Sequence, residues 1–448
     1  MAETTRLIFS ALIEKYPEEY EFHQIGLFHC YAVTEPLWPI YSTKTLQLCD
    51  GKVGFVGNDV YGQLTFGEIV EKIKPDIVFA FNDPQNLIYL CSLPGERNYK
   101  LILYVSVDGF PLPPDYGPML ARADLVVTMS EFSLRVLLAA YHQVPKSKTD
   151  FMYSPADTVR FQPINDLDKS SLRKDLFPDW MPSDAFVLGW IGRNQWRKQV
   201  WVPYKVIHYL RRGAYFVCER CCKVTLYDWD PISQHHLNVA GEALESPPSF
   251  TFDICLYCGS SEIVTAKPLL DIVLWLHMPD DDPRTTWPLP LIEQQFGIRK
   301  ECDVHYTENC KFKAALAPAD MPTLYNLWDC FLYLSGGEGF GIPAWEAMCA
   351  SLPVVHTNYS SHSEFLRKAN GGIPIGGLLQ PEAKTCIWRM VADVSQAIEA
   401  IRKLYFERDL GKTLGGNGRR FVQHYTLTSQ ATKWHRIFQL QRGASLST

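Results

Sequence analysis

The sequence predicts an α/β protein with two doubly wound domains, each built on a parallel sheet. The chain has 448 residues, a length that suits two domains. Short apolar runs alternate with helical segments along most of it, which is typical of parallel sheets covered by helices. A glycine-rich segment at 335–341 links an apolar run to a helical stretch, as ligand-binding turns of such folds do.

The first domain is expected over residues 1–163. Strands are predicted at 21–28, 76–81, 100–106 and 124–129, and residues 6–15 have the apolar spacing of a helix. Ser130 is placed to cap the helix that follows the last of these strands. Asp108 follows the strand at 100–106, at the edge where doubly wound folds bind ligands, although an ordinary turn aspartate explains it equally well.

The second domain is expected over residues 184–425, after a linker at 164–183 in which Asp, Lys, Ser and Pro accumulate. Its first strand, at 185–191, precedes a helix at 202–212, and an insertion at 214–265 then interrupts the alternation. The later elements predicted here are strands at 269–277, 303–306, 330–334 and 353–357 and helices at 394–406 and 417–425. A last helix is expected within residues 426–448.

The segment from Ser335 to Val355 carries the clearest chemistry. Its glycines allow a tight turn and a close approach of backbone to ligand, and Pro343 suits the start of a helix. The N-terminus of that helix favours an anion such as phosphate. Glu338 and Glu346, with seven residues between them, can each accept hydrogen bonds from a pair of sugar-type hydroxyls. Phosphate and hydroxyl groups together indicate a nucleotide-sugar.

This segment resembles the E-x7-E signature of the family 4 retaining glycosyltransferases, which have the GT-B fold of two Rossmann-like domains facing across a cleft. The chain departs from the usual pattern at Cys349 and Ser351, neither of which is a ligand group in the family. Gly192-Arg193 through Lys198 resembles the family's G-R-x4-K segment. The resemblance covers roughly residues 75–435, apart from the insertion.

The resemblance implies transfer of a sugar, with retention, from a UDP- or GDP-sugar to an acceptor hydroxyl. The first domain would bind the acceptor, the second the donor, and the tail helix at 426–448 would cross back to the first domain. The family usually needs no catalytic divalent cation. The acceptor stays open among saccharide, lipid, protein and modified nucleic acid.

The family's residue roles carry over to matching positions. Arg193 and Lys198 would neutralise the donor diphosphate, with Arg197 as the candidate if the register differs by one. Glu338 would hold the donor sugar and Glu346 the ribose. Asp108 would act near the reacting sugar. Backbone N–H groups at the helix start would also bind the diphosphate, and they belong to Gly339, Phe340, Gly341 and Ile342.

Two other functions fit parts of the sequence. A sugar-nucleotide epimerase or a phosphorylase of the same fold would use the same loop and cations. A non-catalytic scaffold would explain why the opening residues lack the glycine-rich loop with which the family usually begins. The intact arginine, lysine and glutamates favour the transferase.

Two C-x2-C pairs lie in the insertion, Cys218 with Cys221 and Cys255 with Cys258, and 33 residues separate the inner cysteines. Four thiolates so spaced predict a structural zinc ribbon, although redox pairs or chance are alternatives and Cys222 could replace a ligand. The insertion has two basic against seven acidic residues, so nucleic-acid binding by the ribbon is not expected.

The composition indicates a cytoplasmic protein. The net charge of −6 gives no general attraction to nucleic acid or anionic membrane. No apolar run approaches the length of a membrane span, and the first residues lack the pattern of a signal peptide. Thirteen cysteines, an odd number scattered through apolar segments, favour a reducing compartment.

Overall fold

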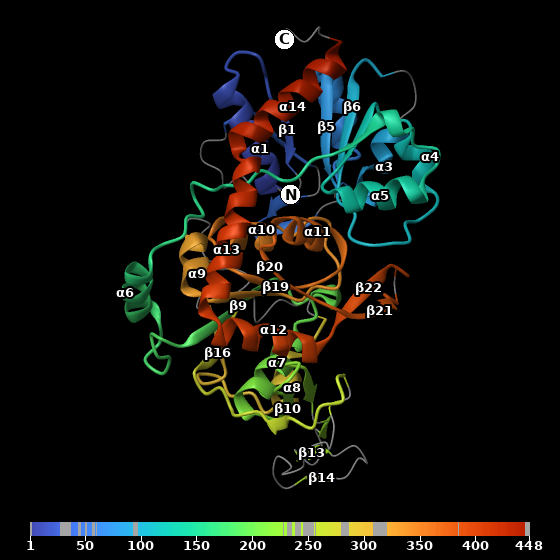
Figure 1. Ribbon diagram of the computed structural model, residues 1–448. Coiled ribbons are helices and arrows are strands. Elements are labelled where there is room, and N and C mark those ends of the chain that lie inside the picture. The colour runs from blue at the N-terminus through green and yellow to red at the C-terminus, as the bar shows by residue number, and fades with distance from the viewer. Residues whose placement is uncertain are drawn as a thin grey trace. The chain divides into compact units, whose positions relative to one another are not determined.

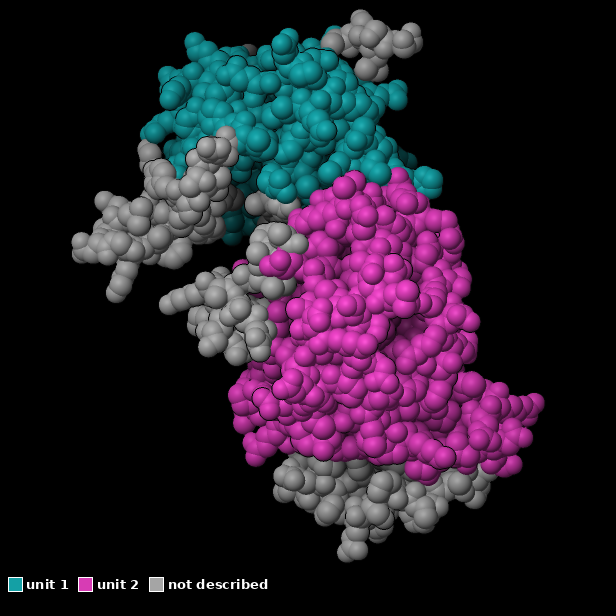
Figure 2. All heavy atoms as spheres, turned by 90° about the vertical axis from the view of Figure 1, so that its left-hand side faces the viewer, with its two compact units in different colours: residues 1–156, 424–448 teal, residues 157–423 magenta. Residues whose placement is uncertain are grey.

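The computed structural model of the chain has two compact units, residues 1–156 with 424–448 and residues 157–423 (Figures 1 and 2). The structure describes residues 2–26, 37–43, 46–49, 52–55, 59, 61–92, 97–226, 228–230, 235–237, 243–244, 255, 257–278, 286–307, 320–383 and 385–443. By this division the predicted linker at 164–183 lies inside the second unit, and the predicted tail segment lies in the first. None of the described helices is both long and apolar enough to cross a membrane.

A four-stranded parallel sheet forms the centre of the first unit, in the order β5-β6-β7-β8. Its strands are β5 (Ile77–Asn82), β6 (Lys100–Val105), β7 (Leu125–Thr128) and β8 (Thr149–Phe151). The predicted strands at 76–81, 100–106 and 124–129 are therefore confirmed. The Ser130 side chain accepts a hydrogen bond from the Ser133 N–H and caps the next helix, as predicted.

The remaining elements of the first unit surround this sheet. Its helices are α1 (Ala2–Lys15), α2 (Thr65–Ile73), α3 (Pro84–Ser92), α4 (Tyr116–Leu120), α5 (Glu131–Ala140) and α14 (Leu427–Arg442). Two short two-stranded sheets pair β1 (Gln24–Gly26) with β2 (Ile40–Ser42) and β3 (Leu46–Cys49) with β4 (Lys52–Phe55). Within the described residues, the four-stranded sheet ends at β5, so the opening residues add no strand to it.

The first and last helices of the chain lie side by side in this unit (Figure 1). The Tyr16 ring stacks on the His435 ring at 3.8 Å between centroids, and the Tyr20 hydroxyl is 2.7 Å from His435 Nδ1. Phe79 of β5 contacts the buried Trp434 of α14. The C-terminal helix is thus part of the first unit's core.

The second unit has a six-stranded parallel sheet in the order β17-β16-β9-β18-β19-β20. The strands are β9 (Phe186–Ile191), β16 (Ile272–His277), β17 (Val304–Tyr306), β18 (Cys330–Tyr333), β19 (Val354–Thr357) and β20 (Gly372–Ile375). The strand order reverses between β9 and β18, because β16 and β17 lie on one side of β9 and the later strands on the other. Doubly wound folds bind ligands at the carboxyl ends of the strands that flank such a reversal.

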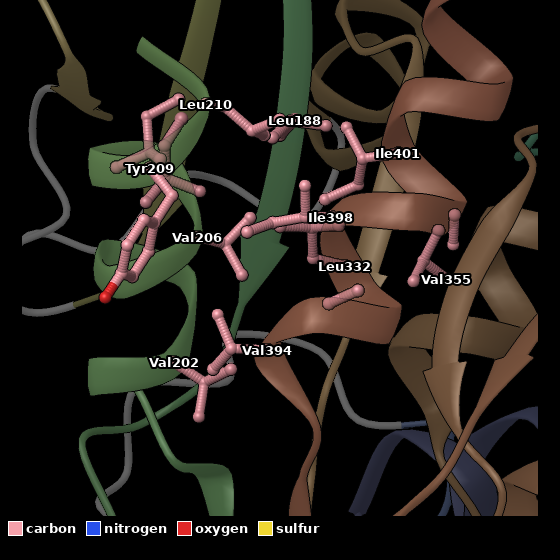
Figure 3. Packing of buried hydrophobic residues seen from close by; sticks show 14 of the residues in the cluster. Leu188, Val202, Val206, Tyr209, Leu210, Leu332, Val355, Val394, Ile398 and Ile401 are labelled. Carbon is pink, nitrogen blue, oxygen red and sulfur yellow. The ribbon is translucent and has the colours of Figure 1, made fainter. Parts of the chain in front are cut away.

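Helices cover this sheet, and their apolar side chains pack against those of the strands to form the core of the second unit. They are α6 (Asp166–Leu176), α7 (Trp201–Arg212), α8 (Leu289–Gln295), α9 (Met321–Leu327), α10 (Ile342–Cys349), α11 (Ser360–Ala369), α12 (Val394–Phe406) and α13 (Arg408–Val422). Figure 3 shows Val206 and Leu210 of α7 and Ile398 and Ile401 of α12 meeting Leu188 of β9. A hairpin of β21 (Gly377–Pro381) and β22 (Trp388–Ala392) lies outside the sheet.

The predicted linker differs from the structure because its middle forms helix α6. Arg173 of this helix is buried and pairs with Asp329 at 2.7 Å, and Asp329 also accepts a hydrogen bond from the Val187 N–H of β9. Lys169 reaches the same carboxylate at 3.0 Å. Because charged residues that suggest a linker pair with the half-buried Asp329, α6 is fixed to the second unit.

The insertion at 214–265 begins and ends in a three-stranded antiparallel sheet, in the order β11-β10-β15. Its strands are β10 (Tyr215–Cys218), β11 (Val224–Leu226) and β15 (Ile263–Thr265). A second small sheet contains β12 (Asp228–Asp230), β13 (His235–Leu237) and β14 (Ala243–Leu244). Residues 227, 231–234, 238–242, 245–254 and 256 of the insertion lie outside the described residues.

Candidate active site

Three loops of the second unit meet at the carboxyl ends of the neighbouring strands β9, β18 and β19. The loop after β9 contains a short 3-10 helix, Trp196–Lys198, and the glycine-rich loop after β18 leads into α10. The first two loops are joined by their backbones, since the Gly336 N–H donates to the Arg197 carbonyl at 2.6 Å. The strand reversal therefore brings together two segments that lie about 140 residues apart.

Glu338 lies between two cations supplied by the β9 loop. Its carboxylate accepts from Arg197 Nη1 at 2.6 Å and from Lys198 Nζ at 2.5 Å, through a different oxygen in each case. Arg197 Nη1 also donates to the Gly337 carbonyl at 3.1 Å. The arrangement holds one carboxylate and two cations within hydrogen-bond distance, with a net charge of +1.

Electrostatics keep Glu338 ionised although it is buried. Burial by itself would raise the pKa of its carboxyl group, but Arg197 and Lys198 hold the pKa well below its usual range. The same burial raises the pKa of the Tyr333 hydroxyl far above its usual value, and the Glu338 charge adds to this. At neutral pH the site therefore contains a charged Glu338 beside a neutral tyrosine.

The structure places Arg197 and Lys198 beside Glu338, whereas Arg193 lies apart from it. The Arg193 side chain is exposed, and among the described residues we find no side-chain hydrogen bond or ion pair for it. Residues 197 and 198 end the short 3-10 helix, and both of their side chains reach Glu338 of the glycine-rich loop. The sequence named Arg197 as the alternative, and it is the arginine that pairs with Glu338. The expected role of Arg193 at the diphosphate stays a prediction.

Two glycines of the loop are required by their surroundings. A Cβ atom at position 336 would lie 2.7 Å from the Gln199 side-chain amide, and one at position 341 would lie 2.9 Å from His362 Cβ. Gly341 also has φ of +112°, which an L side chain rarely adopts. The loop thus packs closely against its neighbours.

Gln199, which the sequence did not single out, ties the hairpin to this site. Its amide nitrogen donates to the Met390 carbonyl at 2.5 Å, and its amide oxygen accepts from the Ala392 N–H at 3.1 Å. The Met390 N–H in turn donates to the Gly336 carbonyl at 3.0 Å. Strand β22 therefore supports both the β9 loop and the glycine-rich loop.

The second glutamate of the signature lies within α10. Glu346 accepts a hydrogen bond from the Tyr325 hydroxyl of α9 at 2.8 Å, which orients its carboxylate. Gly341 precedes the helix, which begins at Ile342 and Pro343, so the first N–H groups of the helix lie at the end of the glycine-rich loop. An anion at this end would be favoured by these groups and by the helix dipole.

The end of β19 and the first turn of α11 add residues that the sequence did not assign. The Glu338 N–H donates to Ser360 Oγ at 2.9 Å, and the Thr357 hydroxyl donates to the Ser335 carbonyl at 2.5 Å. His362 lies between these two hydroxyls. The polar run Tyr359–Glu364 directly after an apolar strand was the available signal, because such positions border ligand sites in parallel sheets.

Asp108 belongs to the first unit, where it follows β6 and is half-buried. Its expected role near a reacting sugar stays a prediction.

The four predicted cysteines come together in the insertion. Their sulfur atoms all lie within 4.8 Å of one another, with Cys218 Sγ 3.6 Å from Cys258 Sγ and Cys221 Sγ 3.7 Å from Cys255 Sγ. Zinc–sulfur bonds of about 2.3 Å in a tetrahedron require sulfur atoms about 3.8 Å apart. These separations fit four thiolates around one zinc ion and exceed the length of a disulfide bond.

The cysteine cluster is attached to the core of the second unit. Cys218 and Cys255 belong to the same buried cluster as the central sheet. Glu399 of α12 accepts from Lys223 Nζ at 3.0 Å and from the Val224 N–H at 2.8 Å. Cys222 is exposed and is not part of the sulfur cluster, so the geometry gives no support to it as a ligand.

Residues 300–419 match the family model described as Glycosyl transferases group 1. This part of the chain contains β18, the glycine-rich loop and α10. The predicted enzyme class, a glycosyltransferase, is confirmed by this match. No curated protein matches the chain in sequence.

Solved structures show the same fold at low sequence identity. HepE of Anabaena, in complex with UDP and glucose, is 14% identical, with a TM-score of 0.61 over 97% of this chain and 95% of that chain. Sucrose-phosphate synthase of Thermosynechococcus elongatus is 13% identical, with a TM-score of 0.60 over 91% of this chain and 89% of that one. A glycosyltransferase of Rickettsia africae is 13% identical, with a TM-score of 0.56 over 91% of this chain and 86% of that chain. These similarities confirm the predicted GT-B fold.

Proposed function

We propose that this glycosyltransferase is a retaining enzyme of the family 4 type that transfers a sugar from a UDP-sugar to an acceptor hydroxyl. The observation that carries the proposal is the Arg197–Glu338–Lys198 cluster beside the start of α10. Such a cluster combines cations for a diphosphate with a carboxylate for sugar hydroxyls.

Arg197 and Lys198 would stabilise the leaving diphosphate. The bond between the anomeric carbon and the phosphate oxygen breaks, and negative charge builds on that oxygen. Fixed cations nearby lower the barrier, because they interact more strongly with the transition state than with the bound donor. The N–H groups at the start of α10 add to this stabilisation.

The two glutamates would position the donor. Glu338 would accept hydrogen bonds from hydroxyls of the sugar, and Glu346, oriented by the Tyr325 hydroxyl, from those of the ribose. The acceptor oxygen then bonds to the anomeric carbon on the face from which the diphosphate leaves. Because the new bond forms on the same face as the old one, configuration is retained, and the acceptor proton passes to the leaving phosphate oxygen.

The choice of UDP is supported by the similar structures, since HepE was solved with UDP and glucose and also with UDP-glucose. The acceptor is an unidentified hydroxyl, and a role for Asp108 near the reacting sugar remains part of the proposal.

We also propose that Cys218, Cys221, Cys255 and Cys258 hold one structural zinc ion in a ribbon. Four sulfur ligands close a tetrahedral site, so such a metal supports the fold and takes no part in sugar transfer. Free thiols at these positions suit a reducing compartment, and we propose the cytoplasm.

The proposal is tested by thermal shift with UDP, GDP and ADP, followed by turnover of UDP-sugars. UDP at a hundredfold excess over its dissociation constant should stabilise the protein by about 2.7 kcal/mol. The shift should be lost in Arg197→Ala and Lys198→Ala and kept in Arg193→Ala, the matched control on the same loop. Stabilisation by none of the nucleotides would exclude the proposed donor, and loss in Arg193→Ala alone would restore the sequence-based assignment.

A further inference from the structure

A chain of hydrogen bonds passes beneath the glycine-rich loop and connects two points of its backbone. The Glu338 N–H donates to Ser360 Oγ at 2.9 Å, and Ser360 Oγ lies 3.3 Å from His362 Nδ1. On the other side of the ring, His362 Nε2 lies 3.0 Å from Thr357 Oγ1. The Thr357 hydroxyl reaches the Ser335 carbonyl, so one imidazole joins residues 335 and 338 through two hydroxyl groups.

The partners fix the direction of every bond in this chain. The Ser335 carbonyl can only accept, so the Thr357 hydroxyl donates to it and must accept from His362 Nε2–H. In a neutral ring, Nδ1 then carries no proton and accepts from the Ser360 hydroxyl. Ser360 Oγ accepts from the Glu338 N–H. The chain therefore requires a neutral imidazole protonated at Nε2.

The surroundings of His362 keep it neutral. The residue is fully buried, and burial, with His356 nearby, lowers the pKa of its ring to about 3. The Glu338 charge raises the pKa of the ring and the Lys198 charge lowers it. A neutral ring is the state that the hydrogen-bond directions demand.

His362 also touches the rest of the loop. Its Cβ is the atom that a side chain at position 341 would meet at 2.9 Å, so it packs directly below the turn into α10. Its ring meets the edge of Tyr333 at 5.0 Å between centroids, and Lys198 Nζ lies 5.3 Å from the Tyr333 ring. His362 thus packs against the end of the loop directly, and it reaches residues 335 and 338 through the Thr357 and Ser360 hydroxyls.

We propose that His362 is the positioning residue of the glycine-rich loop. Together with Thr357 and Ser360 it holds the backbone from 335 to 341 in the one geometry that presents Glu338 and the start of α10 to the donor. The loop contains four glycines and has wide conformational freedom of its own, so its geometry depends on such external bonds. The activity readouts below rest on the proposed function.

A pair of serine-to-glycine variants separates positioning from stability. Ser360 and Ser351 both have positive φ, at 61° and 57°, so glycine relieves the backbone at either position. Ser360→Gly removes a hydroxyl that belongs to the hydrogen-bond chain. Ser351→Gly, just beyond α10, removes a hydroxyl that does not. Ser360→Gly should lower kcat with a UDP-sugar by about tenfold or more, as misplaced catalytic geometry does. Loss of two buried hydrogen bonds opposes this relief of the backbone, so activity is measured well below the unfolding midpoint of each variant.

The matched Ser351→Gly variant should keep the kcat of the unaltered protein. Affinity for UDP should fall less than kcat in Ser360→Gly, because Arg197 and Lys198 belong to the β9 loop and only the N–H groups at the start of α10 depend on the glycine-rich loop. Equal kcat values for the two glycine variants would overturn the proposal, and so would a tenfold loss accompanied by an equal loss of UDP affinity. His362→Gln, which can still donate and accept, should retain more activity than His362→Leu; equal losses would count against the hydrogen-bond chain.

Nuclear magnetic resonance tests the hydrogen-bond chain without any substrate. The ¹⁵N shifts of the His362 ring should report protonation at Nε2, and the Glu338 amide should exchange more slowly in the unaltered protein than in Ser360→Gly. Protonation at Nδ1, or equal exchange rates, would overturn the proposed arrangement. If the protein turns over no nucleotide-sugar, the proposed function fails while this measurement still decides the positioning role.

Discussion

At the scale of single residues, the Glu338 carboxylate bonds to two cations and is also proposed to bind hydroxyls of the donor sugar. Arg197 and Lys198 each bond to one of its oxygens, so donor hydroxyls would have to share this carboxylate with two cations. The negative charge of this carboxylate therefore also lowers the net positive charge available to bind a diphosphate. Removing its charge separates the two roles.

Glu338→Gln should bind UDP at least as tightly as the unaltered protein but turn over a UDP-sugar about a hundredfold more slowly. The net charge of the cluster rises from +1 to +2, which favours the diphosphate, while the amide is a poorer acceptor for sugar hydroxyls in the transition state. Calorimetric titration of UDP and initial rates measure the two effects. Weakened UDP binding with unchanged turnover would contradict the proposed role.

The same carboxylate makes stability depend on pH. Its pKa in the folded protein lies below the value of about 4.3 expected in the unfolded chain, so its ion pairs stabilise the fold above that pH and are lost as the pH falls below it. The unaltered protein should therefore exceed Glu338→Gln in free energy of unfolding at pH 7, and the gap should narrow below about pH 4.3. Urea unfolding at several pH values checks this; a gap that widens in acid would refute it.

At the scale of elements, the cysteine cluster joins the insertion to the core of the second unit. Two of its cysteines are in the core, and Glu399 of α12 bonds to both Lys223 and Val224. Loss of a metal here should therefore loosen the second unit as well as the insertion.

The purified protein should contain one zinc ion per chain, measured by elemental analysis. A chelator should remove it slowly and lower the midpoint of thermal unfolding, because metal binding contributes directly to folding. Cys221→Ser should reproduce this loss. Cys222→Ser, a change of the neighbouring exposed cysteine, should keep both metal and stability. A metal-free protein of unchanged stability would exclude a structural metal.

Helix α6 is fixed by one buried ion-pair network. Arg173→Met removes the buried partner of the half-buried Asp329 and should lower the free energy of unfolding by about 3–5 kcal/mol. Lys174→Met, at the next and exposed position, should change it by less than about 0.5 kcal/mol. Denaturant unfolding compares the two; equal effects would mean that Asp329 does not depend on α6.

At the scale of the whole molecule, the chain returns to its first unit at the end. Helix α14 packs against α1 and β5, so residues from both ends of the sequence form one core. The hydrophobic core of the first unit therefore forms completely only when helix α14 packs against it.

Trp434→Ala should destabilise the first unit by about 3–5 kcal/mol, since Trp434 is fully buried against Phe79 and Tyr104. Hydrogen exchange followed by mass spectrometry should show faster exchange in β5, β6 and α1, and unchanged exchange in β9, β18 and β19. Uniformly faster exchange in both units would indicate that they unfold as one body.

Most strands and helices could be predicted from the sequence because their signals are local. Apolar runs gave β5, β6, β7, β9 and β18, and apolar spacing gave α12 with its observed bounds, 394–406. The linker prediction differed from the structure because charged residues were interpreted as solvated. The pairing of Arg173 with Asp329 joins residues 156 positions apart, which no local pattern records.

The sequence by itself determined two doubly wound domains, the glycine-rich loop with Glu338 and Glu346, and the four cysteines, because each depends on patterns along the chain. The resemblance of the 335–355 segment to a known family implied the GT-B fold. Only the tertiary structure decided that Arg197 accompanies Lys198 at Glu338, and that Gln199, Ser360 and His362 support the loop. Their partners come from loops after different strands. Such contacts exist only once parallel strands distant in sequence lie side by side, and the 3-10 turn then selects which arginine faces the site.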